Sequence, residues 1–177
     1  MAKVVFFILS CILVFLVTIY FRLGAHRPVE ISRSTETDLL LLFKKQTGPY
    51  HLVSSTISEI ETWAARNNIP CRRTFGEYLD DPRQTEDRHL RSNVGCILEQ
   101  APRGISSPYQ IKKLSVKNWV VARFDGAPSL GPLRVYPKVQ SYLKENHLQQ
   151  GGPVLEIYTT SGERAASTEY LFPVNEP

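Results

Sequence analysis

The pattern of apolar and polar positions divides the chain into one uninterrupted apolar run and a longer region of short alternating segments. The run covers residues 4–21, VVFFILSCILVFLVTIYF, and contains no charged residue. As an α-helix it would span about 27 Å, close to the roughly 30 Å hydrocarbon thickness of a bilayer. Tyr20 and Phe21 stand where interfacial aromatic residues are found, and Arg22 follows them. The pattern predicts a single membrane-spanning helix.

A cleaved signal peptide is the alternative for this run. Its apolar region would cover about 7 to 15 residues and end at a small-x-small site. The run is longer here, and the nearest candidate site, residues 23–25, directly follows Arg22. Lys3 lies on the amino side of the run, whereas Arg22, Arg27 and Arg33 lie on the carboxyl side. This bias predicts a single-pass protein with a cytosolic domain.

Beyond a polar juxtamembrane linker at residues 22–36, one order of elements is predicted twice. Each pass starts with a strand, at residues 39–45 and 118–124, and a Gly-Pro pair then opens a helix, at residues 48 and 131. The apolar positions of the two helices recur at helical spacing: Val53, Ile57, Ile60, Trp63 and Ala64 in the first, and Tyr136, Val139, Leu143 and Leu148 in the second.

Two further strands are predicted after each helix. They cover residues 72–80 and 92–99 in the first pass, and residues 154–160 and 168–174 in the second. The sequence therefore predicts an α+β domain at residues 37–175, built from a duplicated strand-helix-strand-strand unit. Two helices can cover only one face of its antiparallel sheet, so we expect the other face to form a groove for a small ligand.

Composition and charge exclude several classes of function. The net charge of +4 comes from 21 basic and 17 acidic residues, and part of it flanks the apolar run. Without a basic stripe interleaved with aromatic residues, direct nucleic-acid binding is not expected. The spacing of Cys and His matches no metal site, so we expect neither a metal nor another cofactor.

Two of the three cysteines, Cys71 and Cys96, lie in the predicted domain. If Asp80 pairs with Ser92 in the hairpin, Gly76 lies opposite Cys96, which leaves Cys71 five residues out of register. At about 3.3 Å per residue the two cysteines would be about 16 Å apart, beyond the roughly 7 Å Cα limit for a disulfide. This register predicts two free thiols.

Several sequence pieces resemble one known family. They are residues 48–50 (GPY), 75–82 (FGEYLDDP), 152–158 (GPVLEIY) and 170–174 (YLFPV), in that order. Together they resemble the GyrI-like domains, which are built of tandem strand-helix-strand-strand modules. The resemblance covers about residues 37–175. It implies binding of small aromatic or cationic organic molecules, as in gyrase-inhibitory proteins and the effector domains of multidrug-responsive regulators.

The resemblance leaves two other functions open. Some relatives hydrolyse cyclopropane-bearing electrophilic toxins, which would make this chain a hydrolase. An apolar anchor ahead of the domain is also similar to animal endoplasmic-reticulum proteins that act as autophagy receptors, which would make it a membrane-tethered adaptor with a protein partner. Turnover, saturable binding or competition by a peptide would distinguish these functions.

Glu156 is the first candidate for the site. The alternation in residues 154–158 places Val154, Glu156 and Tyr158 on one face and Leu155 and Ile157 on the other. If the helices cover the latter pair, Glu156 faces the groove together with Tyr158, and both are predicted to contact the ligand. There it could attract a cation or, in an enzyme, act as the catalytic acid or base. A solvent-facing Glu on an exposed sheet is the alternative.

Four more residues are predicted to contact the ligand. Gly76 and Tyr78 share one face of their strand and occupy the positions in the first pass that correspond to Glu156 and Tyr158. We expect this pair to form the opposite wall, with Gly76 allowing a close approach, although a β-bulge would also explain a glycine in a strand. Tyr50 and Trp119 are further candidates for stacking walls, with a place in the core as the alternative for each.

Overall fold

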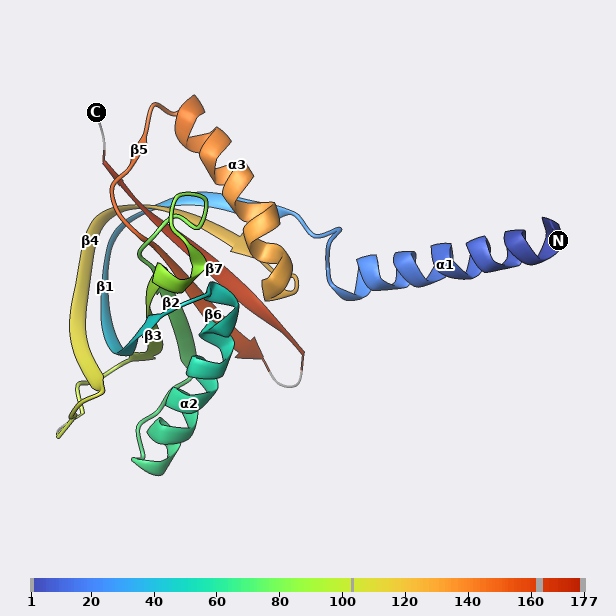
Figure 1. Cartoon of the computed structure of the whole chain (residues 1–177). Coiled ribbons are helices and arrows are strands. Elements are labelled where there is room, and N and C mark those ends of the chain that lie inside the picture. Colours follow the sequence, from blue (N-terminus) through green and yellow to red (C-terminus); the bar gives the residue numbers. More distant parts are fainter. Residues whose placement is uncertain (1, 103, 162–163, 176–177) are drawn as a thin grey trace.

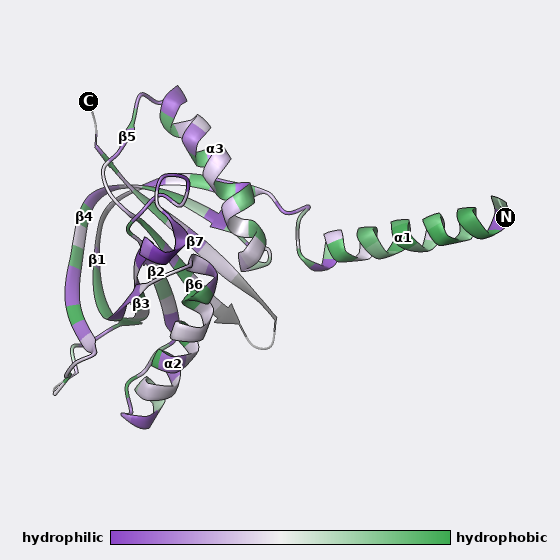
Figure 2. Cartoon of the chain, in the orientation of Figure 1, coloured by the Kyte–Doolittle hydropathy of each residue, from purple (hydrophilic) through white to green (hydrophobic). Residues whose placement is uncertain are grey.

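The computed structural model describes residues 2–102, 104–161 and 164–175. A long helix, α1 (Ala2–Arg22), projects away from an α+β domain in Figure 1. None of its residues is buried, and Figure 2 shows the helix coloured as hydrophobic along most of its length. The helix is long and apolar enough to cross a membrane, a property that signal sequences share.

The domain contains strands and helices in the order that the sequence predicts, with additional short elements. Its helices are α2 (Val53–Arg66) and α3 (Gly131–Glu145), and each is preceded by a 3₁₀ turn, η1 (Tyr50–Leu52) and η3 (Pro128–Leu130). The strands are β1 (Val29–Thr47), β2 (Arg73–Tyr78), β3 (Arg91–Leu98), β4 (Tyr109–Phe124), β5 (Gln149–Gln150), β6 (Val154–Ser161) and β7 (Arg164–Asn175), and a third 3₁₀ turn, η2 (Asp87–His89), lies between β2 and β3.

The main sheet is antiparallel and closes on itself. Its strand order is β4-β1-β3-β2-β6-β7, and β4 also pairs with β7. The closure depends on β1 and β4, which pair with each other from Val29 opposite Phe124 to Lys44 opposite Tyr109. Figure 1 shows these two long strands curving around one side of the domain. The strand β1 thus begins within the stretch that the sequence analysis assigned to a linker.

The two halves of the repeat meet at the centre of the sheet, where β2 pairs with β6. Gly76 lies opposite Glu156, and Tyr78 lies opposite Val154. The duplicated arrangement predicted from the sequence therefore brings equivalent strands of the two halves side by side.

Both helices pack on the outer face of the sheet, as predicted, but the other face is not a groove. The outer face holds two apolar clusters, one with Val135, Val139 and Leu143 of α3 and one with Ile60 and Ala64 of α2. The inner face is filled by a third cluster of buried residues: Leu39, Leu41, Phe43, Phe75, Ile97, Trp119, Leu155, Ile157 and Leu171. The groove prediction is wrong because β1 and β4 are long enough to close the sheet around this cluster.

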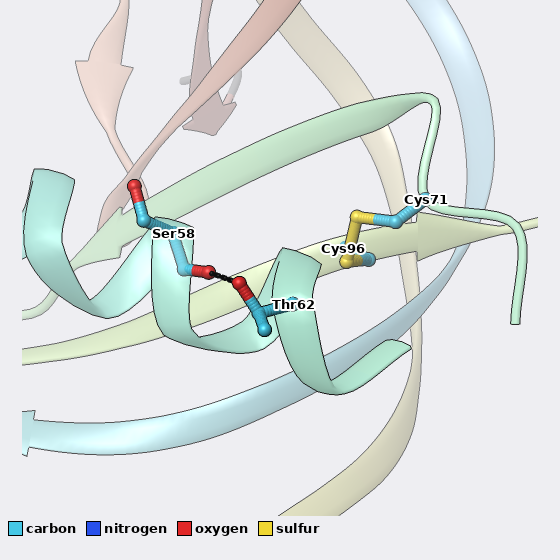
Figure 3. The surroundings of a disulfide bond; sticks show 4 residues. All are labelled: Ser58, Thr62, Cys71 and Cys96. Carbon is cyan, nitrogen blue, oxygen red and sulfur yellow. Dashed lines mark hydrogen bonds between the residues drawn. A yellow bond between two sulfur atoms is a disulfide. The ribbon is translucent and has the colours of Figure 1, made fainter. Parts of the chain in front are cut away.

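Cys71 and Cys96 form a disulfide, so the prediction of two free thiols is wrong. In the structure Tyr78 pairs with Ser92, which places Thr74 opposite Cys96. This register differs by two residues from the assumed one, and β2 starts only at Arg73. Cys71 therefore lies in the connection from α2, which returns over the sheet and brings the two Cα atoms to 5.4 Å (Figure 3).

A short turn joins α1 to the domain. The Ala127 amide donates a hydrogen bond of 2.9 Å to the Leu23 carbonyl, and the Arg27 guanidinium donates one to the Asp125 carbonyl. Gly24 has a φ of +68° and lies so close to Gly126 that an added Cβ would be 3.0 Å from the Gly126 Cα. The end of α1 is thus fixed against the segment that leads from β4 into α3.

Candidate functional site

Glu156 lies on β6 in the middle of the sheet, where only 4% of its surface is exposed. Its neighbours Leu155 and Ile157 belong to the inner cluster, so Glu156 lies on the opposite, outer face, and the alternation correctly separated it from them. The expected packing is reversed, however. The helices cover the face that holds Glu156, and the inner face is filled by the side chains of the strands.

The Glu156 carboxylate accepts hydrogen bonds from two tyrosines. The Tyr136 hydroxyl, on α3, donates to Oε1 at 2.9 Å, and the Tyr158 hydroxyl donates to Oε2 at 3.0 Å. The Tyr158 hydroxyl is also 2.8 Å from the Tyr78 hydroxyl on the adjacent strand. Among the described residues, neither Lys nor Arg forms an ion pair with Glu156. The site is a buried carboxylate held by neutral hydroxyl groups.

Burial determines the ionisation of this cluster. Desolvation raises the pKa of Glu156 to about 7, and the hydrogen bonds from Tyr136 and Tyr158 limit the rise. Desolvation also raises the pKa values of Tyr78, Tyr136 and Tyr158, and the nearby carboxylate raises them further. Near neutral pH the three hydroxyls therefore stay protonated, whereas Glu156 can gain or lose a proton.

Tyr170 adds a fourth ring beside Glu156. It lies on the adjacent strand β7, directly across from Glu156 in the pairing with β6. It is fully buried, and its pKa is raised by desolvation and by Glu156. Its hydroxyl lies by the buried Thr168 hydroxyl, and neither has a well-formed hydrogen bond in the described part of the chain. A Cβ at Gly131 would lie 1.6 Å from the Tyr170 hydroxyl oxygen. This glycine lets the start of α3 approach the ring.

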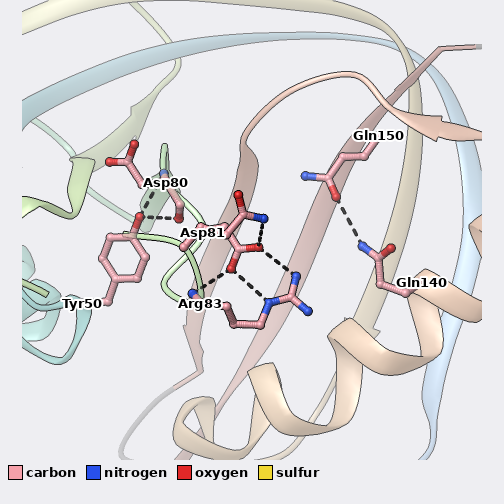
Figure 4. Close-up of polar contacts among 7 residues, drawn as sticks. Tyr50, Asp80, Asp81, Arg83, Gln140 and Gln150 are labelled. Carbon is pink, nitrogen blue, oxygen red and sulfur yellow. Dashed lines mark hydrogen bonds and ion pairs between the residues drawn. The ribbon is translucent and has the colours of Figure 1, made fainter. Parts of the chain in front are cut away.

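The structure also brings Gly76, Tyr78 and Tyr50 to this site. A Cβ at Gly76 would be 3.1 Å from the Tyr78 ring. The missing side chain therefore leaves room for this ring, whose hydroxyl lies next to that of Tyr158. The Tyr50 ring contacts the Tyr78 ring edge-on, with centroids 4.7 Å apart. Its hydroxyl donates to the Asp80 carbonyl at 2.8 Å, as Figure 4 shows. Tyr50 therefore supports Tyr78 from the side of α2.

Trp119 does not belong with these residues. It is buried in the inner cluster, on the side of the sheet opposite Glu156. The indole therefore has the core position that the sequence analysis gave as its alternative.

Sequence reasoning missed two members of the site, Tyr136 and Tyr170. Both were visible in the apolar pattern, Tyr136 on the helix stripe and Tyr170 two residues before Phe172 on its strand. Tyr136 was counted only with the apolar stripe of its helix and Tyr170 only with the YLFPV piece, because the helices were expected on the other face. The signal that could have identified them is a tyrosine on an element that packs next to a lone buried glutamate.

A second buried acid lies at the inner face. Glu77 accepts hydrogen bonds from Asn93 and Lys112, and the Lys112 ammonium lies 5.4 Å from the centroid of the Phe43 ring. Its charge is therefore paired within the fold, unlike that of Glu156. Among the described residues, no group of three or more His, Cys, Asp or Glu is placed to hold a metal ion.

The fold is an α+β domain of duplicated strand-helix-strand-strand modules. The family model of the GyrI-like small molecule binding domain matches residues 30–175. The chain therefore belongs to the GyrI-like family, as the motifs indicated. No curated protein matches it.

Solved structures show the same fold at low sequence identity. The crystal structure of the EcmrR C-terminal domain is 13% identical, with a TM-score of 0.65, over 85% of this chain and 98% of that domain. EcmrR in its cryo-EM complex with DNA is 11% identical, with a TM-score of 0.66. The match covers 84% of this chain but spans only 58% of that protein. A hydrolase from Listeria innocua is 12% identical, with a TM-score of 0.53, over 82% and 92% of the two chains.

Proposed function

We propose that α1 anchors the protein in a membrane and that its GyrI-like domain binds a small organic cation at Glu156 and the surrounding tyrosines. The observation that supports the cation most is the burial of Glu156 without a positively charged partner among the described residues. An ionised carboxylate is costly to bury unless a charge compensates it. A bound cation would supply that charge.

The tyrosines support the same kind of ligand. Tyr78, Tyr136 and Tyr158 are each partly exposed, whereas the carboxylate lies behind them. The faces of aromatic rings attract cations, and the attraction increases when the cation loses its water. A ligand with a positive group and an aromatic body would therefore contact rings first and place its charge toward Glu156.

A matched pair of probes tests this proposal. Benzyltrimethylammonium carries a cation, and neopentylbenzene has the same shape without charge. A desolvated charge contact contributes about 1.5 to 3 kcal/mol, so Glu156→Gln should weaken the cation roughly 10- to 100-fold in calorimetric titrations. The affinity of the neutral probe should change little. Because only the ionised carboxylate attracts a cation, the affinity of wild-type protein should also rise as the pH increases through about 7.

Glu169→Gln is a suitable control. Glu169 lies on β7 next to Tyr170 and is only partly buried, so its loss should leave both affinities unchanged. If Glu156→Gln has no effect on the cation, or weakens both probes equally, the site assignment is wrong.

A hydrolase is the second candidate, favoured by the pKa of about 7 at Glu156. A carboxyl group with this pKa can serve as a general acid or base at neutral pH, with the Tyr136 and Tyr158 hydroxyls as neighbouring donors. The same Glu156→Gln variant distinguishes the two functions. In an enzyme, turnover of a cyclopropane-bearing substrate should fall by about 10² to 10⁴ while binding persists. In a binding protein, the wild type should show no turnover.

A further inference from the structure

We propose that the folded domain lies on the lumenal or extracellular side of the membrane, in an oxidising compartment. The observation is the Cys71–Cys96 disulfide, which is independent of the ligand site. Disulfides form and persist in secretory and extracellular compartments, whereas the cytosol keeps most thiols reduced.

The disulfide is part of the outer core. Cys96 is fully buried on β3, in the cluster that packs beneath α2. Cys71 is partly buried against the same cluster, in the connection that follows Asn67 at the end of α2. The bond joins residues 25 positions apart and fastens the end of α2 to the sheet. Its placement in the core indicates a structural disulfide that forms as the domain folds.

The apolar helix is compatible with this placement. As a cleaved signal sequence, or as an anchor whose amino terminus stays in the cytosol, α1 would deliver the domain to the same side. The opposing charge bias is small. Lys3 precedes the helix, and Arg22, Arg27 and Arg33 follow it. Arg27 donates a hydrogen bond to the Asp125 carbonyl, so its guanidinium is held against the domain. The disulfide is thus the stronger indication of compartment.

Thiol counting in the full chain is the first test. Cys11, in α1, is the remaining cysteine and is free. In a Cys11→Ser background, cells should be lysed in denaturant with a polyethylene glycol maleimide. We expect no adduct before reduction and two adducts after it. Two adducts before reduction would show that the domain is reduced in the cell and would overturn the proposal.

Glycosylation gives a second readout that does not depend on the thiols. The chain has no Asn-x-Ser/Thr sequence, but Arg83→Asn creates one with Gln84 and Thr85. The Arg83 side chain is 85% exposed, and its ion pair with Asp81 lies at the surface, so the change should leave the fold intact. In a eukaryotic host we expect this variant to carry an endoglycosidase-sensitive glycan that the Arg83→Gln control lacks. An unglycosylated Arg83→Asn chain would place the domain in the cytosol.

Discussion

At the scale of single residues, Glu156 differs from the other buried glutamate, Glu77, in the groups that pair with its carboxylate. Glu77 is buried to a similar degree, yet Lys112 and Asn93 pair with it. Glu156 has only hydroxyl donors, and desolvation exceeds their effect on its pKa. The charge of Glu77 is thus paired within the fold, whereas Glu156 is the glutamate that we propose for the ligand.

The raised pKa of Glu156 makes stability depend on pH. The folded protein holds this proton up to about pH 7, whereas an unfolded glutamate loses it near 4.5. The stabilising contribution is therefore complete below pH 4.5 and is lost as the pH rises through 7. The difference between the folded and unfolded pKa values of Glu156 corresponds to at most about 3 kcal/mol in the free energy of unfolding. Urea unfolding of residues 23–177 at pH 5 and pH 8 should show this fall, after correction with Glu156→Gln.

Glutamine supplies the reference for that experiment because it stays neutral across the range. Subtracting its pH dependence removes the contributions of all other titrating groups. If wild type and Glu156→Gln lose stability in parallel, the carboxyl group titrates normally and is not desolvated.

At the scale of elements, the position of α3 depends on the glycine at its start. With an added Cβ 1.6 Å from the Tyr170 hydroxyl oxygen, Gly131→Ala must displace the helix or the ring. Overpacking of this kind costs about 1 to 3 kcal/mol. We expect Gly131→Ala to lower the free energy of unfolding accordingly and to loosen the Tyr136–Glu156 hydrogen bond, since Tyr136 lies on the same helix.

Tyr170→Phe provides the matched test. It removes the oxygen that clashes, while the ring carbon 2.7 Å from the added Cβ remains. In a Tyr170→Phe background, Gly131→Ala should therefore be less damaging but not neutral, and a double-mutant cycle measures the difference. Equal costs in both backgrounds would mean that the helix does not depend on this contact.

The order of elements could be predicted from the sequence because apolar residues recur at one spacing in helices and at another in strands. The face that α3 covers could not. Strand alternation separates Glu156 from Leu155, but it does not say which side the helices take. That choice depends on β1 and β4, whose polar segments, such as residues 32–38 and 112–117, gave no strand signal. Their long pairing closes the sheet and fixes the inner face.

The disulfide was missed for a related reason. A shift of two residues in the β2–β3 register preserves the face of every side chain, so the apolar pattern cannot detect it. In addition, the connection before β2 turns back over the sheet. The distance between the two cysteines had been estimated by continuing the strand in a straight line. Gly76, Tyr78 and Glu156 were nevertheless correctly placed on one face, because that inference needs only alternation.

At the scale of the whole molecule, the domain is held close to the end of its apolar helix. The turn through Gly24 and the hydrogen bond from Ala127 to Leu23 leave little free chain between α1 and the domain. The contacted segment leads into η3 and then into α3, which carries Tyr136. A membrane anchor would therefore hold the start of α3, and the proposed ligand site beneath it, near the bilayer surface.

The anchor itself gives the last prediction. Because α1 has no buried residue, it contributes nothing to the core, and residues 23–177 should fold as a soluble domain. The full chain should stay in the membrane pellet through alkaline carbonate extraction. Val14→Arg, at the middle of the helix, adds roughly 2.5 to 3.5 kcal/mol to the cost of insertion and should release part of the protein, whereas Val14→Ala should not. Recovery of the wild type in the supernatant, with a mass that lacks α1, would instead identify the helix as a cleaved signal sequence.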